Sequence, residues 1–220
     1  MHQPVTVYAL HTADIQQMDW TPLYTAMPER MKKAERFRFE KDRLLCIGAG
    51  LLLLHALPLR NESELQTGPY GKLFVPGKRF FNLSHSGHWC ILAAGDMEIG
   101  ADIEEIRESN VSIASSIYSP REIEWMNEQP LDRFHLLWTW KESVMKATGL
   151  GLNLNPKSID VLPFTQDKPI SLNGRTWYAK SGNIPGYRYS LCTAHPIDSW
   201  NWVDGSALIH PSGQETANKP

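Results

Sequence analysis

The segment from residue 80 to residue 107 constrains the fold most strongly, because it alternates short β-prone runs with turn signals. The run 89–94, WCILAA, predicts a buried strand that ends at Gly95, and the run 99–106 predicts a second strand. Before both of them, the small polar residues 84–87, SHSG, indicate a turn. The chain is therefore expected to place a turn and two strands within this one short segment.

The second of these strands carries two acids on one face. Asp102 and Glu104 are two positions apart, so their carboxylates point to the same side of a strand while Ile103 points to the other. Two carboxylates about 5 Å apart repel by roughly 3 kcal/mol at an effective dielectric constant of about 20. A third acid at the same place would therefore need a strong compensating charge.

Glu142 is the candidate for that third acid. It lies four residues before Lys146 in a predicted helix over 131–148, so the two side chains share a helix face. Three acids in one place would repel by about 10 kcal/mol, so either they lie apart in the fold or a divalent cation joins them. Because oxygen ligands favour Mg²⁺ over Zn²⁺, a site made of Asp102, Glu104 and Glu142 is predicted to bind Mg²⁺.

The flanking segments predict helices on both sides of the strands. The run 44–57 is apolar all round, which is typical of a helix packed on every side. Ser119 and Glu122 form a capping box with Pro at the first helical position, so a helix is expected to begin there. Gly149 is a C-cap signal for the helix over 131–148. From 159 to 194, strand-like runs alternate with turn residues and predict a meander.

Length, charge and cysteine content set broader limits. The 220 residues suit either one large domain or two small ones. A net charge of −2 gives no general reason to expect nucleic acid or an anionic membrane as a partner. The three cysteines are far apart and are interpreted as buried free thiols of a reducing compartment. The N-terminus has no signal-type apolar core and the longest apolar run has 14 residues, so a cytoplasmic protein is expected.

Three motifs in combination resemble the Sfp-type 4′-phosphopantetheinyl transferases. They are NLSHSG at 82–87, GADIE at 100–104 and WTWKESVMKATGLGL at 138–152, and Asp102 follows His85 by 17 residues. The resemblance extends from about residue 5 to about residue 197. It implies a transferase that moves the phosphopantetheine arm of coenzyme A onto a serine of an apo acyl or peptidyl carrier protein and releases 3′,5′-ADP.

The resemblance also implies the architecture. The family has an α+β fold of two similar halves related by a pseudo-twofold axis, with the ligand between them. By that implication, residues 1–100 form an N-terminal half, residues 101–203 form a C-terminal half, and residues 204–220 form a flexible polar tail. The protein is expected to act as a monomer, with its metal-binding acids at the junction of the halves.

Residues that bind coenzyme A are carried over from the family by position. Arg30 and Lys33 fall where the family has basic residues that bind the 3′-phosphate, and Ser84 and His85 match its Ser-His pair that binds phosphates. Lys72, in a segment that resembles the Gly-Lys-Pro motif of the family, is expected to contact phosphate or nucleotide. Judged without the resemblance, the basic residues of 28–43 belong to a solvated helix face and His85 is a structural hydrogen-bonding residue.

Some positions depart from the family pattern and put individual ligand contacts in doubt. Leu45 stands where the family often has Arg, Cys46 stands where a hydroxyl residue can meet the nucleotide, and Leu73 replaces the Pro of the Gly-Lys-Pro motif. Leu54 or His55 occupies another frequent Arg position.

The mechanism implied by the resemblance assigns the remaining roles. Asp102, Glu104 and Glu142 would hold Mg²⁺ against the pyrophosphate of coenzyme A, and Lys146 would neutralise charge on the leaving group. Glu142 would accept the proton of the carrier serine directly or through water, although a carboxylate bound to Mg²⁺ is a poorer base. Lys141, on a different helix face, is expected at the surface or near a phosphate.

Two other classes of function remain open from the sequence. A Mg²⁺-dependent phosphodiesterase or nuclease could use the same three acids and lysine with water as the acceptor. A non-catalytic coenzyme A binding protein could have kept the fold, although the presence of all three acids and Lys146 argues against it. The sequence does not indicate whether the carrier serves fatty acid, polyketide or nonribosomal peptide synthesis.

Overall fold

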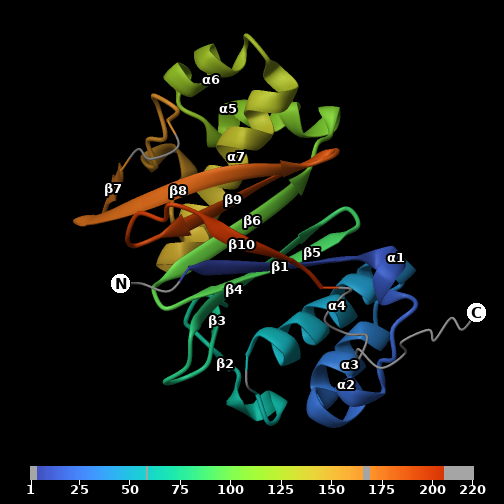
Figure 1. The fold of residues 1–220 in the computed structure, drawn as a ribbon. Helices are drawn as coiled ribbons and strands as arrows, with labels where there is room; N and C mark the ends of the chain where they lie inside the picture. The colour runs from blue at the N-terminus through green and yellow to red at the C-terminus, as the bar shows by residue number, and fades with distance from the viewer. Residues whose placement is uncertain (1–3, 58, 166–168, 206–220) are drawn as a thin grey trace, which may run out of the picture.

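The computed structural model describes residues 4–57, 59–165 and 169–205, and Figure 1 shows their arrangement. Two four-stranded sheets form the centre of the molecule. The first sheet has the strand order β10 (Trp200–Asp204), β1 (Val5–His11), β5 (Trp89–Gly95), β4 (Phe80–Ser86). The second has the order β6 (Ile99–Glu105), β9 (Tyr187–Thr193), β8 (Arg175–Ile184), β7 (Pro169–Leu172). A two-stranded ribbon joins β2 (Gln66–Thr67) to β3 (Leu73–Phe74).

Helices cover the outer faces of both sheets (Figure 1). The helices α1 (Thr12–Ile15) and α4 (Glu40–Ala56) pack on the first sheet, and α2 (Thr21–Ala26) and α3 (Pro28–Glu35) pack on α4. The helices α5 (Ala114–Ile117), α6 (Pro120–Met126) and α7 (Pro130–Thr148) lie on the side of the second sheet. Short 3₁₀ turns span Glu62–Glu64, Glu108–Ile113, Gly151–Asn153 and Pro156–Ser158.

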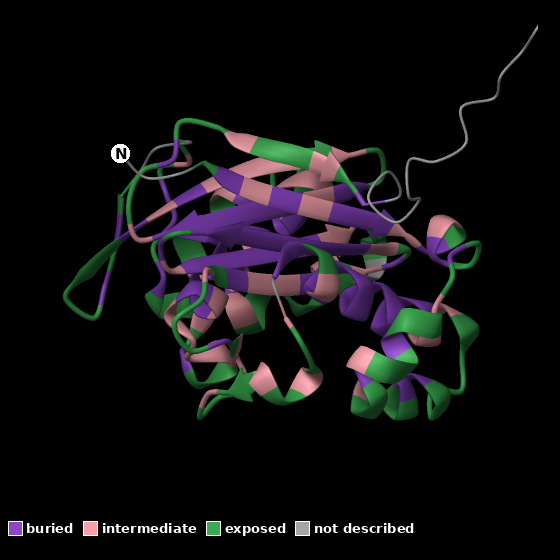
Figure 2. Ribbon diagram, turned by 60° about the horizontal axis from the view of Figure 1, so that its bottom comes forward, coloured by how far each residue is buried: buried purple, intermediate pink, exposed green. Residues whose placement is uncertain are grey.

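Three apolar clusters hold these layers together. One surrounds α4, whose residues from Leu44 to Leu53 are all buried, as the absence of a polar face predicts. A second surrounds α7, and a third fills the space between the sheets with residues such as Val7, Ile91, Ile103 and Leu191. Figure 2 shows this pattern as largely buried strands beneath helices that expose one side. The three cysteines are buried free thiols, as predicted.

Several predicted elements are confirmed. The strands over 89–94 and 99–106 are β5 and β6, and the Ser119–Glu122 capping box begins α6. Helix α7 ends at Thr148, and Gly149 adopts φ 73° in the left-handed region, as its C-cap position requires. Strand β10 pairs in parallel with β1 on the first sheet, so the chain returns to its N-terminal sheet after residue 200. The division into two halves stays a prediction, and residues 206–220 of the expected tail lie outside the described residues.

The prediction of a turn over 84–87 is wrong. Ser84, His85 and Ser86 belong to β4, and the turn between β4 and β5 is formed by Gly87 and His88. Small polar residues can occupy this strand because the neighbouring strand β6 supplies partners for them. The backbone N–H groups of Ala101, Ile103 and Glu105 donate to side-chain oxygens of Asn82, Ser84 and Ser86, respectively, at 2.8, 3.3 and 3.0 Å.

These contacts form the β4–β6 seam, which we define as the edge where the side chains of Asn82, Ser84 and Ser86 join the first sheet to the backbone of β6. Gly100, on the face of β6 that packs on α7, allows the helix to approach closely. A Cβ atom there would lie 2.0 Å from the carbonyl oxygen of Ser143. The seam and the close packing of α7 together bring the two sheets and one helix to the same point. No helix in the described ranges combines the length and apolar character needed to cross a membrane.

Candidate active site

Asp102 lies at this meeting point and is held by β4 and α7 at once. Its side chain is 2% exposed, and its Oδ1 accepts a hydrogen bond from Ser84 Oγ at 2.9 Å. The Lys146 ammonium on α7 donates to the same Oδ1 at 2.5 Å and to Ser84 Oγ at 3.0 Å. The other oxygen, Oδ2, is buried and has no hydrogen-bond partner among the described residues. Asp102 therefore presents one satisfied and one unsatisfied oxygen.

Glu104 points to the same face as Asp102, as the strand alternation predicts. Its Oε2 accepts from Ser86 Oγ at 2.9 Å, and its Oε1 accepts from the indole Nε1 of Trp138 on α7 at 3.3 Å. Burial, and then the charge of Asp102, raise the pKa of Glu104 to about 7. The position of this carboxylate is thus set by one residue of the β4–β6 seam and one residue of α7.

Glu142 and Lys146 bring the charges of α7 to the same region. Burial, followed by the charges of Asp102 and Glu104, raises the pKa of Glu142 to about 7. Burial alone would lower the pKa of Lys146, but the surrounding carboxylates, Asp102 first, outweigh that effect and raise it. The charge of one ammonium group therefore serves three carboxylates, of which Asp102 contacts it directly, and burial is the first cause of the raised pKa of the other two.

The predicted metal ligands are thus gathered in one region, but they surround Lys146. Within the described part of the chain, no three His, Cys, Asp or Glu side chains are arranged so that they could hold a metal ion. The all-oxygen donor set and the unpartnered Oδ2 of Asp102 nevertheless fit a hard divalent cation. The assignment of Asp102, Glu104 and Glu142 as metal ligands stays a prediction.

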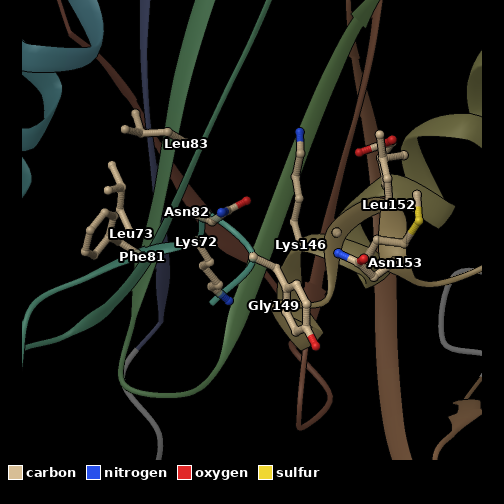
Figure 3. A pocket seen from close by; sticks show the side chains of 14 residues that line it. Lys72, Leu73, Phe81, Asn82, Leu83, Lys146, Gly149, Leu152 and Asn153 are labelled. Atoms are coloured by element: carbon tan, nitrogen blue, oxygen red, sulfur yellow. The ribbon is translucent and has the colours of Figure 1, made fainter. Parts of the chain in front are cut away.

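A cavity of about 500 Å³ opens beside Glu142 and Lys146. Figure 3 shows Lys72 and Lys146 between Leu73 and Phe81 on one side and Leu152 and Asn153 on the other. Its other lining residues, mostly apolar or glycine, are Tyr70, Gly71, Asn82, Leu83, Met145, Gly149 and Gly151. The cavity thus combines an apolar wall with charged groups at one place.

Lys72 lines this cavity, but its ammonium is engaged with the backbone. Its Nζ donates to the carbonyl oxygens of Ile99 and Ala147 at 2.9 and 3.0 Å, and burial lowers the pKa of Lys72 to about 8. These bonds tie the β2–β3 ribbon to the start of β6 and the end of α7. Its predicted contact with phosphate or nucleotide stays a prediction.

A second, smaller recess of about 120 Å³ collects the predicted phosphate-binding residues. Arg30 and Lys33 reach it from α3 and His85 reaches it from β4, although they are far apart in the sequence. The buried Nε of Arg30 has no hydrogen-bond partner within the described ranges. Partial desolvation, and then the charge of Lys146, lower the pKa of His85. Other lining residues are Phe37, Asp42, Leu45, Cys46 and Ala49.

Lys146 borders the cavity and is linked to the recess through strand β4. The Lys146 side chain lines the cavity, and its Nζ contacts Ser84, whose neighbour His85 lines the recess. Leu45 and Cys46, which depart from the family pattern, lie at the recess. The site therefore has three parts: a cationic recess, an ammonium group beside the acids, and a largely apolar cavity.

Comparison with known proteins assigns the family. The model of the 4′-phosphopantetheinyl transferase superfamily matches residues 98–192. The transferase Sfp of Bacillus subtilis is 30% identical over 185 residues, which cover 77% of this chain and 82% of that protein. A 4′-phosphopantetheinyl transferase of Bacillus pumilus is 36% identical over 185 residues, which cover 76% of this chain and 78% of that protein. The chain belongs to the Sfp-type 4′-phosphopantetheinyl transferases.

This membership makes the protein an enzyme that uses coenzyme A to transfer 4′-phosphopantetheine to carrier proteins. Another transferase of the family, also from Bacillus subtilis, is 34% identical over 188 residues, covering 76% of this chain and 82% of its own. The predictions of family, α+β fold class and activity are confirmed. The reading of the chain as a non-catalytic binding protein is not supported.

Sequence reasoning missed three residues around the acids of this transferase: Ser86 and Trp138 bind Glu104, and Asn82 binds the backbone of β6. Ser86 and Asn82 belong to the NLSHSG motif, and their spacing on either side of Ser84 would have shown that all three share one strand face. Trp138 lies four residues before Glu142, one helical turn away. Lys141 was expected at the surface or near a phosphate, and this is wrong, since its side chain is fully buried in an ion pair with Glu122.

The shared ammonium predicts opposite stability effects for two substitutions. At pH 8 with EDTA, Lys146→Met should lower the unfolding free energy by about 2 kcal/mol, because three partly buried carboxylates lose their cation. Glu142→Gln should raise it by about 1 kcal/mol, because one repelling charge is removed. Chemical denaturation of both variants and the wild type measures the two differences.

The pH dependence of stability is a control for the comparison of Lys146→Met with Glu142→Gln. Because the folded-state pKa of Glu142 is raised to about 7, its stability penalty is present above that pH and fades as the pH falls toward 5.5. The gain from Glu142→Gln should therefore shrink at pH 5.5. Two variants that change stability in the same direction at pH 8 would contradict the shared-ammonium arrangement.

Proposed function

We propose that coenzyme A binds across Lys146, with its 3′-phosphate in the recess, its pyrophosphate beside Lys146 and its pantetheine arm in the cavity. The ligand is anionic at the nucleotide end and less polar along the arm, and the two spaces differ in the same way. Arg30 and Lys33 supply the charge at the recess, and Leu73, Phe81 and Leu152 supply apolar surface at the cavity. The gathering of Arg30, Lys33 and His85 at the recess, with Lys146 at the edge of the cavity, is the observation that supports this placement most directly.

Asp102, Glu104 and Glu142 are the residues proposed to hold Mg²⁺. The unpartnered Oδ2 of Asp102 supports this, and so do the raised pKa values of Glu104 and Glu142, which burial causes first and the charge of Asp102 second. A bound Mg²⁺ supplies charge neutralisation for the pyrophosphate and the leaving group. Ser86 and Trp138 keep the Glu104 carboxylate oriented for this role.

The transfer itself is a substitution at the β-phosphorus of coenzyme A. The hydroxyl oxygen of the carrier serine forms a bond to phosphorus, and the bond to the bridging oxygen breaks, so that 3′,5′-ADP leaves with the electron pair. The Lys146 ammonium, kept charged by its raised pKa, donates to the oxygens on which negative charge develops. Glu142 accepts the serine proton directly or through water, and through water it can do so while its carboxylate also holds Mg²⁺.

All of these groups come from a single chain, which supports a monomer as the active form. Residues of α3 and β4 supply the recess, whereas β6 and α7 supply the acids and Lys146. The ligand would thus lie at the β4–β6 seam, between an N-terminal half over 1–100 and a C-terminal half over 101–203, with β10 added to the first sheet.

Incubation with coenzyme A, Mg²⁺ and an apo carrier protein tests this function. The carrier should gain the mass of one phosphopantetheine group on its serine, and 3′,5′-ADP should appear in equal amount. EDTA should abolish both products. Cleavage of coenzyme A with an unchanged carrier would instead indicate a phosphodiesterase and contradict the proposal.

The recess makes a separate prediction about the 3′-phosphate. Arg30→Ala should raise the KM for coenzyme A about tenfold, since a lost hydrogen bond between charged groups is worth roughly 1.5–3 kcal/mol. The KM for 3′-dephospho-coenzyme A should change less than about twofold. Arg36→Ala, at the exposed end of the same helix, is the matched control. Equal losses for both ligands would remove Arg30 from the 3′-phosphate site.

A further inference from the structure

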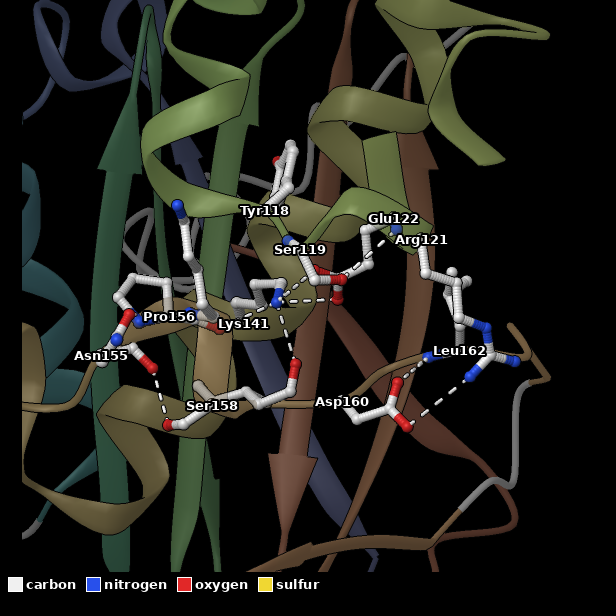
Figure 4. Close-up of polar contacts among 12 residues, drawn as sticks. Tyr118, Ser119, Arg121, Glu122, Lys141, Asn155, Pro156, Ser158, Asp160 and Leu162 are labelled. Carbon is white, nitrogen blue, oxygen red and sulfur yellow. Dashed lines mark hydrogen bonds and ion pairs between the residues drawn. The ribbon is translucent and has the colours of Figure 1, made fainter. Parts of the chain in front are cut away.

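Lys141 carries a fully buried ammonium group on the far side of α7 from the β4–β6 seam. Its side chain is 0% exposed and its partner Glu122 is 2% exposed. The Nζ lies 2.8 Å from Glu122 Oε1 and 2.9 Å from Oε2, and it also donates to the carbonyl oxygens of Pro156 and Ile159 at 2.8 and 2.9 Å (Figure 4). One ammonium group thus binds a helix and a loop to α7.

Glu122 extends this contact to the beginning of α6. Its Oε2 accepts from the backbone N–H of Ser119 at 2.8 Å, as the N3 residue of the capping box. The Lys141–Glu122 network, formed by these two residues with Ser119 and the carbonyl groups of Pro156 and Ile159, therefore joins three segments. A buried ion pair is weak evidence for stability, because apolar residues of the same volume often stabilise as well or better. What the Lys141–Glu122 network does provide is a fixed relative position of α6, α7 and the loop over 156–159.

The Lys141–Glu122 network lies directly behind the active site on α7. Lys141 precedes Glu142, and successive residues of a helix are about 100° apart around its axis. On the other side of α7, Lys146 contacts Asp102 and Ser84. Besides the packing of α7 on the second sheet, two charged contacts oppose its rotation, that of Lys146 toward the seam and that of Lys141 toward α6 and the loop over 156–159.

The two attachments differ in what the reaction requires of them. In the proposed function, Lys146 donates to the phosphate oxygens of coenzyme A, so the attachment toward the seam takes part in the reaction. The Lys141–Glu122 network uses no group that meets a substrate. A side-chain tip about 6 Å from the helix axis moves by about 1 Å when the helix rotates by about 10°. A displacement of that size can cost about 100-fold in rate.

We propose that Lys141 and Glu122 are positioning residues that fix the rotation of α7 while Lys146 engages the phosphates of coenzyme A. They hold Glu142 and Lys146 in place for the transfer without contacting coenzyme A or the carrier. This inference rests on the proposed function, since it assigns a role to residues behind the same site.

The test replaces the ion pair by neutral residues of similar size. The single variant Lys141→Met would leave Glu122 buried and unpaired. If that variant unfolded, the result would say nothing about positioning. The double variant Lys141→Met/Glu122→Gln removes both charges and keeps an acceptor for the N–H of Ser119. It should fold, lower kcat at least tenfold and leave the KM for coenzyme A within about twofold. Arg133→Met/Glu128→Gln removes another ion pair of α7 and is the matched control, with kcat expected to stay unchanged.

Activity is measured per folded molecule, with folding followed by near-UV circular dichroism. A merely structural role would lower the unfolding midpoint and leave kcat of the folded fraction at the wild-type value, which would overturn the proposal. A KM for coenzyme A that rises as much as kcat falls would also overturn it. If the double variant is too unstable to assay, kcat and KM are measured for Glu122→Gln instead. An unchanged kcat of the folded fraction, or a KM that rises as much as kcat falls, would again overturn the proposal. Failure of the wild type to modify the carrier would reject the proposed function instead, so the two failures are distinguishable.

Discussion

The β4–β6 seam is the contact on which the rest of the structure depends. Asn82, Ser84 and Ser86 accept hydrogen bonds from three N–H groups of β6, so side chains of one sheet satisfy the backbone of the other. Two of these side chains have a second task, since Ser84 donates to Asp102 and Ser86 donates to Glu104. Two of the side chains that join the sheets therefore also orient Asp102 and Glu104, so a change in the seam changes the site.

Charge balance explains how this site can exist before any ligand binds. Asp102, Glu104 and Glu142 share the ammonium group of Lys146, and the pKa values of the two glutamates rise to about 7. A site so short of positive charge favours a cation and is poorly suited to an anion alone. Coenzyme A and Mg²⁺ are therefore expected to bind together, because each supplies charge that the other requires.

Much of this arrangement could be predicted from local sequence patterns, and the exceptions have a common cause. The two strands, the shared face of Asp102 and Glu104, and the ends of α6 and α7 follow from alternation and capping signals within a few residues. The turn predicted over 84–87 failed because the partners of Ser84 and Ser86 lie about 19 residues later in the chain. The burial of Lys141 was missed for the same reason, since Glu122 and the carbonyl groups of Pro156 and Ile159 meet only in the folded protein.

The dependence of the metal site on the seam can be measured with Ser86. A Mg²⁺ titration by calorimetry in saturating coenzyme A would compare the wild type with Ser86→Ala and Ser86→Thr. Loss of the hydroxyl should weaken Mg²⁺ binding about tenfold or more, because residues that orient metal ligands typically contribute that much. Ser86→Thr keeps the hydroxyl and should bind Mg²⁺ nearly as well as the wild type. Equal Mg²⁺ affinity in Ser86→Ala and the wild type would contradict the conclusion that the joint between the sheets orients the acids.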